Sequence, residues 1–325
     1  MPYAIRAEGL EKRFGETLAL DGVSLAAEPG TVLGVLGPNG AGKTTTTRIL
    51  ATLTAPTAGR AEVGGYDVVA EAHRVRRLVG LTGQYAGVDE MLTGFENLLL
   101  LGRLVGMPRR AARARAAELL DRFRLTEAGE RAAKTYSGGM RRRLDLAASL
   151  VARPRVLFLD EPTTGLDPRS RGDLWDVVRE LTGDGVTVLL TTQYLEEADQ
   201  LADDLVVIDR GRVIADGPPE QLKAQVGGQV LEVAPVRAAD REAVARIVGE
   251  LAGAAPEVGE ALVSAPVSDP AVLTAVVRRL DDAGITVGEM SLRKASLDEV
   301  FLALTGHRAE ETAATDEQET EEVPA

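Results

Sequence analysis

Gly37-Pro38-Asn39-Gly40-Ala41-Gly42-Lys43-Thr44 fits the pattern G-x-x-x-x-G-K-[ST]. An apolar, strand-like run (31–36) precedes it, and a helix-like run (44–53) follows. Such a loop turns consecutive backbone N–H groups toward phosphate oxygens, and the following helix directs the positive end of its dipole to the same point. Lys43 supplies a cation for the β and γ phosphates, and Thr44 supplies a hydroxyl for Mg²⁺. The stretch therefore predicts that the protein binds a nucleoside triphosphate.

The composition excludes several other functions. The 37 Lys and Arg residues against 50 Asp and Glu residues give a net charge of −13, which disfavours nucleic acid as a partner. There is no cysteine and there are only two histidines, so disulfides, thiol chemistry and a His-rich metal site are excluded. Residues 1–15 lack the apolar core of a secretion signal, and no run approaches the roughly 18 apolar residues of a spanning helix. We therefore expect a cytoplasmic chain that does not itself cross a membrane.

The order of apolar runs predicts an α/β fold. Strand-length runs at 156–159 and 185–190 alternate with helix-like stretches at 137–151 and 170–182, as in a parallel sheet covered by helices. Residues 73–126 read as mostly helical, and the runs at 205–208 and 212–214 read as a terminal hairpin.

The 325 residues, 45% of them hydrophobic, suffice for a large domain and a small one. Pro and Gly at 216–219 and Gly at 227–228 indicate a boundary. We expect a nucleotide-binding domain over 1–220 with a helical subdomain at about 85–150, a small α+β domain over 228–306, and a disordered acidic tail over 307–325. The small domain is expected to hold strands at 229–236, 261–265 and 285–292 and helices at 240–252, 269–282 and 296–304.

Two further motifs accompany the phosphate loop. The apolar run 156–159 ends in Asp160 and Glu161, where an Asp can hold Mg²⁺ and the next acid can accept a proton from an attacking water. Ser137-Gly138-Gly139 opens the preceding helix and offers a hydroxyl and free N–H groups to a second anion. Each motif alone is also compatible with an ordinary turn or cap, but their order favours a catalytic site.

The combined order of motifs resembles the ATP-binding subunit of an ABC transporter over residues 1 to about 220. It comprises the phosphate loop, Gln84, Tyr136-Ser137-Gly138-Gly139-Met140, Asp160-Glu161-Pro162 and Gly165-Leu166-Asp167-Pro168. The resemblance implies a P-loop NTPase of the ABC ATPase type with ATP and Mg²⁺ as cofactors. It also implies two copies that sandwich ATP, and a separate transmembrane permease that holds the chain at the inner face of the membrane.

The resemblance also implies roles for individual residues. Glu161, Gln193 and Gln84 are expected to be catalytic, and Thr44, Gln84 and Asp160 to bind the metal. The expected nucleotide contacts are Phe14, Gly37, Pro38, Asn39, Gly40, Ala41, Gly42, Lys43, Thr44 and Thr45, with Ser137, Gly138, Gly139 and Asp167 reaching across the dimer. Phe14 is the expected stacking partner of adenine, although Tyr3 is a competing aromatic residue.

One position departs from the family pattern, since Gln193 stands where a His is usual. Glutamine can donate a hydrogen bond to phosphate but can neither become a cation nor relay a proton. Either Glu161 alone is the base, which we favour, or hydrolysis is slow. The segment around Gln193 and residues 296–301 are similar to the daunorubicin-resistance group of drug-export ATPases, which implies export of a drug or other lipophilic compound. The alternatives are a non-transport ABC module and an ATP-sensing subunit with weak turnover.

Overall fold

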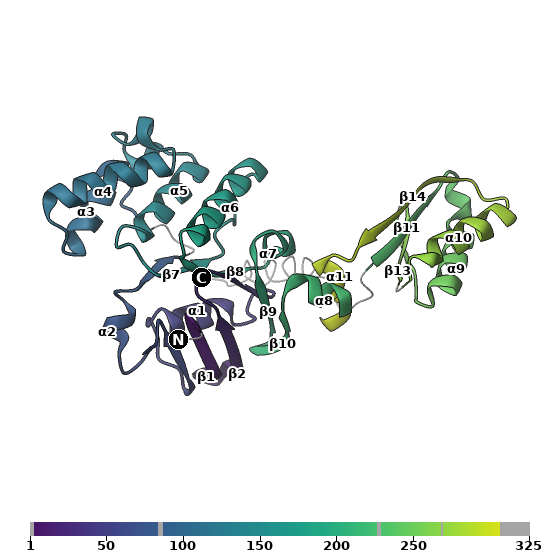
Figure 1. The fold of residues 1–325 in the computed structure, drawn as a ribbon, viewed down its shortest axis with the longest axis horizontal. Helices are drawn as coiled ribbons and strands as arrows, with labels where there is room; N and C mark the ends of the chain where they lie inside the picture. Colours follow the sequence, from purple (N-terminus) through teal and green to yellow (C-terminus); the bar gives the residue numbers. More distant parts are fainter. Residues whose placement is uncertain (1–2, 84–86, 226–228, 268, 306–325) are drawn as a thin grey trace, which may run out of the picture. The chain divides into compact units, whose positions relative to one another are not determined.

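The computed structural model describes residues 3–83, 87–225, 229–267 and 269–305, without the side chains of 303–305 (Figure 1). Contacts divide the chain into two compact units, the first ending at Asp216 and the second beginning at Gly217. Helix α8 (Pro219–Gln225) thus belongs to the second unit, whereas we expected the first domain to reach 220 and the second to begin at 228. The acidic tail lies outside the described residues. Among the described residues, no helix combines the length and apolar character needed to cross a membrane.

The first unit is built on a six-stranded sheet in the order β10-β9-β3-β8-β7-β6. Strand β3 pairs in parallel with β8 and β9, and β7 pairs in parallel with β8 and β6. The strands are β3 (Val32–Leu36), β6 (Val79–Thr82), β7 (Val156–Asp160), β8 (Thr187–Thr192), β9 (Asp204–Asp209) and β10 (Arg212–Gly217). Every residue of β3, β7 and β8 is buried, which explains why the middle of each strand reads as an apolar run.

The prediction of a mostly helical segment over 73–126 was wrong at β6, which lies at the edge of this sheet beside β7. Four residues are too few to show a strand period, and Gly80 is a poor strand former. Glycine is needed there because a Cβ at Gly80 would lie 2.6 Å from the Ser149 carbonyl oxygen. Strand β8 begins at Thr187 and not at 185, because Gly185, with φ 87°, first turns the chain after α6.

A four-stranded antiparallel sheet in the order β2-β1-β4-β5 completes the core on one side. Its strands are β1 (Ile5–Phe14), β2 (Thr17–Ala27), β4 (Ala58–Val63) and β5 (Tyr66–Asp67). One apolar cluster packs this sheet and α1 (Lys43–Leu50) against β3, β7 and β8, with Phe158 fully buried in it. Helix α1 ends before the predicted residue 53 because Thr52 takes a positive φ of 62°.

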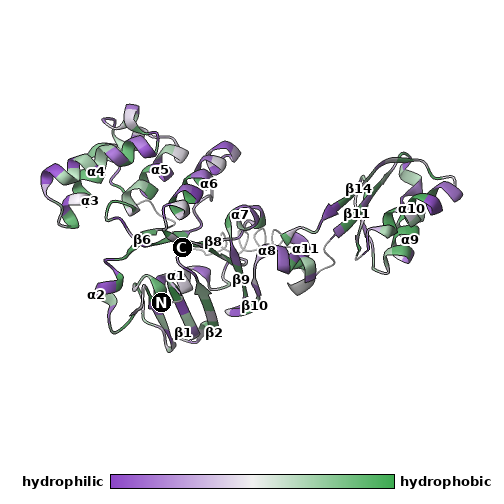
Figure 2. Cartoon of the chain, in the orientation of Figure 1, coloured by the Kyte–Doolittle hydropathy of each residue, from purple (hydrophilic) through white to green (hydrophobic). Residues whose placement is uncertain are grey.

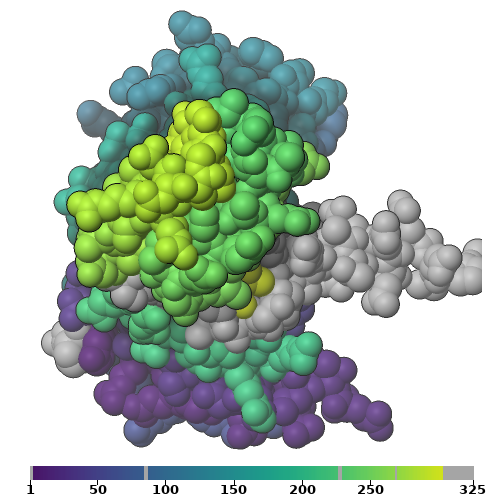
Figure 3. All heavy atoms as spheres, turned by 90° about the vertical axis from the view of Figure 1, so that its right-hand side faces the viewer, coloured from purple at the N-terminus to yellow at the C-terminus, as the bar shows by residue number. Residues whose placement is uncertain are grey.

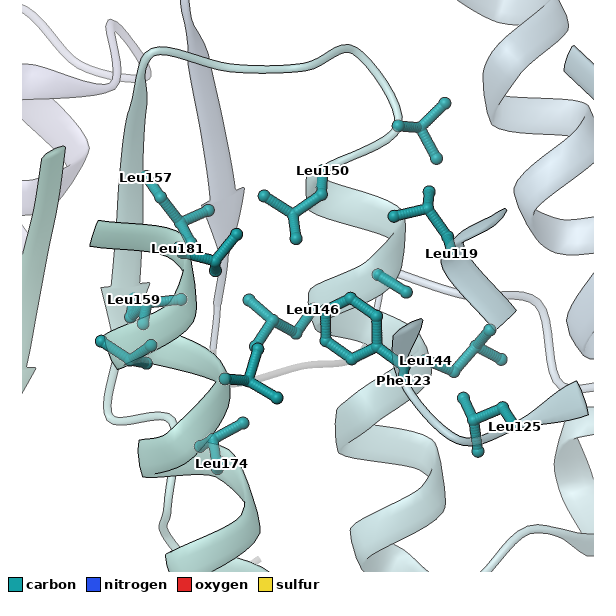
Figure 4. Close-up of a cluster of buried hydrophobic side chains, with 14 of the residues drawn as sticks. Leu119, Phe123, Leu125, Leu144, Leu146, Leu150, Leu157, Leu159, Leu174 and Leu181 are labelled. Carbon is teal, nitrogen blue, oxygen red and sulfur yellow. The ribbon is translucent and has the colours of Figure 1, made fainter. Parts of the chain in front are cut away.

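A second apolar cluster covers the other face of the central sheet (Figure 4). It joins Leu157 and Leu159 of β7 to side chains of α4, α5 and α6, with Phe123 enclosed between them. The helices of this unit are α2 (Ala72–Val75), α3 (Gly94–Leu104), α4 (Arg109–Arg122), α5 (Gly138–Ser149), α6 (Pro168–Gly183) and α7 (Leu195–Leu201), with short 3-10 turns at Thr126–Ala128 and Ala133–Thr135. The cluster fixes α5 directly against the strand that ends in Asp160.

The second unit is an antiparallel sheet in the order β12-β13-β11-β14 with two helices packed on it. Its elements are α8, β11 (Gln229–Pro235), a 3-10 turn (Ala238–Asp240), α9 (Arg241–Ala252), β12 (Glu257–Val258), β13 (Val263–Val267), α10 (Ala271–Asp282), β14 (Val287–Lys294) and α11 (Leu297–Thr305). Helices α9 and α10 each carry a hydrophobic and a hydrophilic face (Figure 2). The heavy atoms of this part of the chain, green to yellow in Figure 3, pack closely against one another. The predicted α/β class with a small α+β domain is confirmed. In the second unit the prediction missed helix α8 and the short strand β12.

Candidate nucleotide-binding site

Four neighbouring parallel strands end at one edge of the central sheet, and each is followed by a motif singled out in the sequence. The phosphate loop follows β3, Gln193 follows β8, Glu161 follows β7, and Gly83 follows β6. In open α/β sheets, ligands bind outside the carboxyl ends of the strands. The topology therefore gathers these motifs at one place. Gln84, next to Gly83, lies outside the described residues.

The phosphate loop surrounds a hollow of about 290 Å³ lined by Ala19, residues 38–45 and Glu161. Helix α1 begins at Lys43 with no side-chain cap on its first N–H groups, which leaves them open to an anion. The Lys43 ammonium donates hydrogen bonds to the carbonyl oxygens of Gly37 at 2.7 Å and Pro38 at 2.9 Å, and it lies 3.3 Å from Glu161 Oε1. Burial lowers the pKa of Lys43, an effect that the nearby carboxylates of Glu161 and Asp160 oppose.

Two glycines of this loop are fixed by close packing. A Cβ at Gly37 would lie 2.2 Å from the Ile208 carbonyl oxygen of β9. Gly42 has a φ of 110°, and a Cβ there would meet Leu20 of β2 at 2.6 Å. Neighbouring strands thus leave room only for glycine at these two positions, and glycine allows the backbone shape that turns the N–H groups of the loop inward.

The two acids lie beside the loop in different environments. Asp160 Oδ1 accepts hydrogen bonds from the Thr191 hydroxyl at 2.6 Å and the Thr44 hydroxyl at 3.2 Å. Glu161 has a positive φ of 48°, and its N–H lies 3.1 Å from the Thr191 carbonyl oxygen. A left-handed backbone at a non-glycine residue costs about 1–3 kcal/mol and persists only where the surroundings enforce it. This turn directs the Glu161 side chain toward Lys43.

Ser137, Gly138 and Gly139 lie at the start of α5, as predicted, and Ser137 caps the helix by accepting from the Met140 N–H at 3.3 Å. Asp167 caps α6 in the same way by accepting from the Ser170 N–H, and the Ser170 hydroxyl and N–H lower the pKa of the Asp167 carboxyl. In the described part of the chain, neither group lines the hollow at the phosphate loop. The structure therefore does not bring the Ser-Gly-Gly turn to the phosphate loop of its own chain.

The two candidate aromatic residues lie at different places in the first unit. Phe14 ends β1, is 51% exposed, and shares the β1–β2 hairpin with Ala19, which lines the hollow. Tyr3 lines a different depression with Arg155 and Thr187, at the edge where β7 and β8 begin. This placement favours Phe14 over Tyr3 as a stacking partner for a base. An exposed ring with the Lys12 ammonium 5.0 Å from its centre is available for such stacking.

Residues 20–164 match the family described as ABC transporter, and residues 217–305 match the one described as ATP-binding protein DrrA1-3-like, C-terminal domain. The chain is 57% identical to the daunorubicin resistance ATP-binding protein DrrA2 of Streptomyces coeruleorubidus, over 96% of this chain and 98% of that protein. It is 51% identical to the daunorubicin/doxorubicin resistance ATP-binding protein DrrA of Streptomyces peucetius, over 98% of each.

The chain belongs to the ATP-binding subunits of ABC transporters. A solved relative, the dimeric ATP-binding cassette in a post-hydrolysis state bound to ADP and phosphate, agrees with a TM-score of 0.60. It is 25% identical and covers 66% of this chain and 98% of that one. Membership of this family makes the chain an ATPase and confirms the P-loop NTPase fold predicted from the motifs.

The donor groups around the loop of this ABC ATPase fit a nucleotide. Uncapped helix N–H groups, a buried ammonium and inward-turned loop amides suit phosphate oxygens. Thr44 Oγ1 and Asp160 Oδ1, 3.2 Å apart, are hard oxygen donors of the kind that Mg²⁺ prefers. Within the described residues no cluster of three or more His, Asp or Glu side chains could hold a metal by itself. Phosphate oxygens and water would complete the shell of a metal held by Thr44 and Asp160.

Gln193, the departure from the ABC pattern, lies half-buried in the bend between β8 and α7. It follows Thr192, whose hydroxyl accepts from the Tyr194 N–H at 2.9 Å and so shapes this bend. The position directly after β8 places Gln193 beside the strand that ends in Asp160, where its amide can donate to phosphate.

Sequence reasoning missed two residues of the site. Thr191 holds both the Asp160 carboxylate and the Glu161 N–H, and the polar end of the run Thr187–Thr192 was a signal for it. Arg142 binds the backbone around both acids. It stands within Arg141-Arg142-Arg143, and a run of three arginines gives no sign of which one is turned inward.

Proposed function

We propose that the chain powers export of a daunorubicin-like, lipophilic compound, as one of two copies that share two Mg·ATP sites. The observation that carries this proposal is the 57% identity to a daunorubicin resistance protein over 96% of the chain, which includes both structural units. A separate membrane permease would provide the path for the compound and hold the chain at the inner face of the cell membrane.

The geometry supports a role for each residue near the phosphate loop. Lys43 and the N–H groups of residues 40–45 would bind the phosphates, and Phe14 would stack on adenine. Thr44 and Asp160 would hold Mg²⁺, which when bound neutralises charge on the phosphate oxygens. Glu161 would accept the proton of the attacking water, and the amide of Gln193 would orient phosphate. Gln84 keeps the metal-contacting and catalytic role that the family resemblance implies.

The Ser-Gly-Gly turn supports the two-copy assembly. Ser137, Gly138 and Gly139 present a helix N-terminus to phosphate, yet the described part of the chain places none of them at its own phosphate loop. A second copy, related by two-fold symmetry, would bring each turn to the other's nucleotide, and Asp167 would align the two sites. The solved relative that is dimeric and bound to ADP and phosphate supports an assembly of two copies.

Export is tested in cells that express the chain with a candidate permease, a multi-span protein sought among the neighbouring genes. We expect lower accumulation of daunorubicin than in cells with the permease alone, measured by the fluorescence of the drug. Cells with the permease and the Glu161→Gln chain are the matched control and should accumulate the drug like cells without the chain. Equal accumulation with the natural chain and with this variant would contradict the proposed export.

Shared sites are tested by mixing two inactive variants. A side chain at Gly138 meets no atom within 4 Å, so Gly138→Asp adds a charge to the outward face without a clash inside the chain. Lys43→Met disables the phosphate loop instead. One of the two sites in a mixed dimer is intact, so we expect ATP hydrolysis to return on mixing, up to a quarter of the natural rate by random pairing of equal amounts of the two variants. Absence of any recovery would argue against sites shared between two copies.

A further inference from the structure

Arg142 lies on α5 one turn after the Ser-Gly-Gly motif. Its guanidinium binds backbone carbonyl groups that follow the ends of two strands, β6 and β7. Its Nε donates to the Pro162 carbonyl oxygen at 2.7 Å and its Nη1 to that of Gly83 at 2.7 Å. Its Nη2 lies 3.2 Å from the carbonyl oxygen of Glu161 and 3.4 Å from that of Asp160. The side chain is only 13% exposed, so these contacts replace water around a buried cation.

Asp145, one turn further along α5, extends the same arrangement. Its Oδ2 lies 3.6 Å from Arg142 Nη1, and its Oδ1 accepts from the Gly87 N–H at 2.7 Å. Its side chain is 5% exposed. One ion pair on one helix therefore binds Gly83 and Gly87, the two residues that flank 84–86, together with the backbone that carries both catalytic acids.

The contacts of Arg142 are better suited to fixing the position of the backbone around the two acids than to filling space. An apolar side chain of similar size would fill the same space without burying a charge, whereas the planar guanidinium fixes several carbonyl groups at once. One of them belongs to Glu161, whose left-handed backbone needs enforcement from its surroundings. Thr191 holds the N–H side of that residue and Arg142 holds its carbonyl side.

We propose that Arg142 and Asp145 are positioning residues that connect the helix of the Ser-Gly-Gly motif to the backbone of both catalytic acids and to both flanks of residues 84–86 within one subunit. Contact of the motif with a second copy, which rests on the proposed function, would then be transmitted to the hydrolytic geometry without passing through the phosphate loop. Neither residue touches the catalytic groups' reacting atoms, so the pair acts through the backbone.

The expected result is a separation of rate from binding. Arg142→Met should lower kcat by about 10- to 100-fold, since misplacement of reacting groups by about 1 Å can cost 10²-fold. The KM for ATP should change less than threefold, because the contacts of Arg142 leave the phosphate loop untouched. Arg142→Lys keeps the charge but lacks the planar fork, so its kcat should lie between that of Arg142→Met and that of the natural chain. Asp145→Asn keeps an oxygen that can accept from the Gly87 N–H, so its kcat should fall less than that of Arg142→Met.

The matched control is Arg141→Met, which removes a half-exposed partner of Glu90 at 2.8 Å on the same helix. Exposed ion pairs contribute about 0–1 kcal/mol, so its rate should remain within twofold. The proposal is overturned if Arg142→Met keeps kcat within twofold, or if kcat and ATP affinity fall together. The inactivity of Glu161→Gln under the same conditions tests the proposed function separately.

A second measurement does not depend on turnover. Amide hydrogen exchange in the full-length chain should become faster in peptides covering 81–88 and 159–165 in Arg142→Met and in Arg142→Lys. Exchange in peptides of the phosphate loop, 36–45, should not change, and Arg141→Met should resemble the natural chain throughout. Equal exchange in the Arg141 and Arg142 variants would overturn the proposal even for a preparation that does not hydrolyse ATP.

Discussion

Glu161→Gln is expected to lower ATP turnover by about 10²- to 10⁴-fold, the range that general-base catalysis contributes, while ATP remains bound. The glutamine amide has the shape of the carboxylate, and its oxygen can still accept a hydrogen bond from Lys43, now 3.3 Å from Glu161 Oε1. It cannot accept the proton of the attacking water at neutral pH. The substitution therefore removes the chemistry and preserves the site that binds the nucleotide.

Two measurements check this result: steady-state release of phosphate, and binding of a fluorescent ATP analogue. Glu196→Gln is the matched control, because this acid on α7 is exposed and its ion pair with Arg171 is long, at 3.7 Å. It should hydrolyse ATP at the natural rate. If Glu161→Gln retained more than a tenth of the natural turnover, another group would have to be the base, and the interpretation that Glu161 alone is the base would be wrong.

The sequence was sufficient to predict the carboxyl edge of the sheet because its strands are fully buried. A buried parallel strand reads as an unbroken apolar run, and such runs before Gly37 and through Leu159 placed the loop and the acids correctly. The edge strand β6 has no such signal, since Val79–Thr82 is short and contains Gly80. Its place in the sheet depends on pairing with β7, a contact between residues far apart in the chain.

The parts of the site that sequence reasoning missed are those made by tertiary contacts. Nothing in the order Arg141-Arg142-Arg143 distinguishes a guanidinium bound to the Pro162 carbonyl group from one that pairs with Glu90 at the surface. The left-handed backbone of Glu161 is equally hidden, because it results from Thr191 and Arg142 holding the two sides of the residue. Motifs report which groups meet the ligand, whereas the groups that hold those motifs in place depend on the packing.

Lys43→Met is the second substitution with a large expected effect, this time on binding. Lys43 is 4% exposed and is the ammonium at the base of the phosphate loop, so its removal deletes a charge-assisted contact to phosphate. Such contacts contribute about 1.5–3 kcal/mol, which corresponds to roughly a 10- to 100-fold loss of ATP affinity. Methionine has nearly the same length and fills the space, so the loss is one of charge and not of packing.

The same substitution changes the site in the absence of nucleotide. Glu161 loses its ion pair with Lys43, and the carbonyl groups of Gly37 and Pro38 lose their donor. Removing one partner of a buried ion pair lowers the free energy of unfolding by about 3–5 kcal/mol. Part of this loss is offset, because the ammonium no longer has to be desolvated when the chain folds. The double variant Lys43→Met with Glu161→Gln should therefore be more stable than Lys43→Met alone, since the neutral amide no longer needs the cation.

Thermal unfolding with and without ATP separates these two effects. A ligand that binds only the folded chain raises the midpoint of unfolding by mass action, so ATP should raise it for the natural chain and for Glu161→Gln. For Lys43→Met the midpoint should start lower and rise much less at the same ATP concentration. Lys134→Met removes an exposed lysine from the same unit and should behave like the natural chain. An equal rise with ATP in Lys43→Met would mean that the loop amides and the dipole of α1 hold the phosphates without the ammonium, and that Lys43 serves mainly to place Glu161.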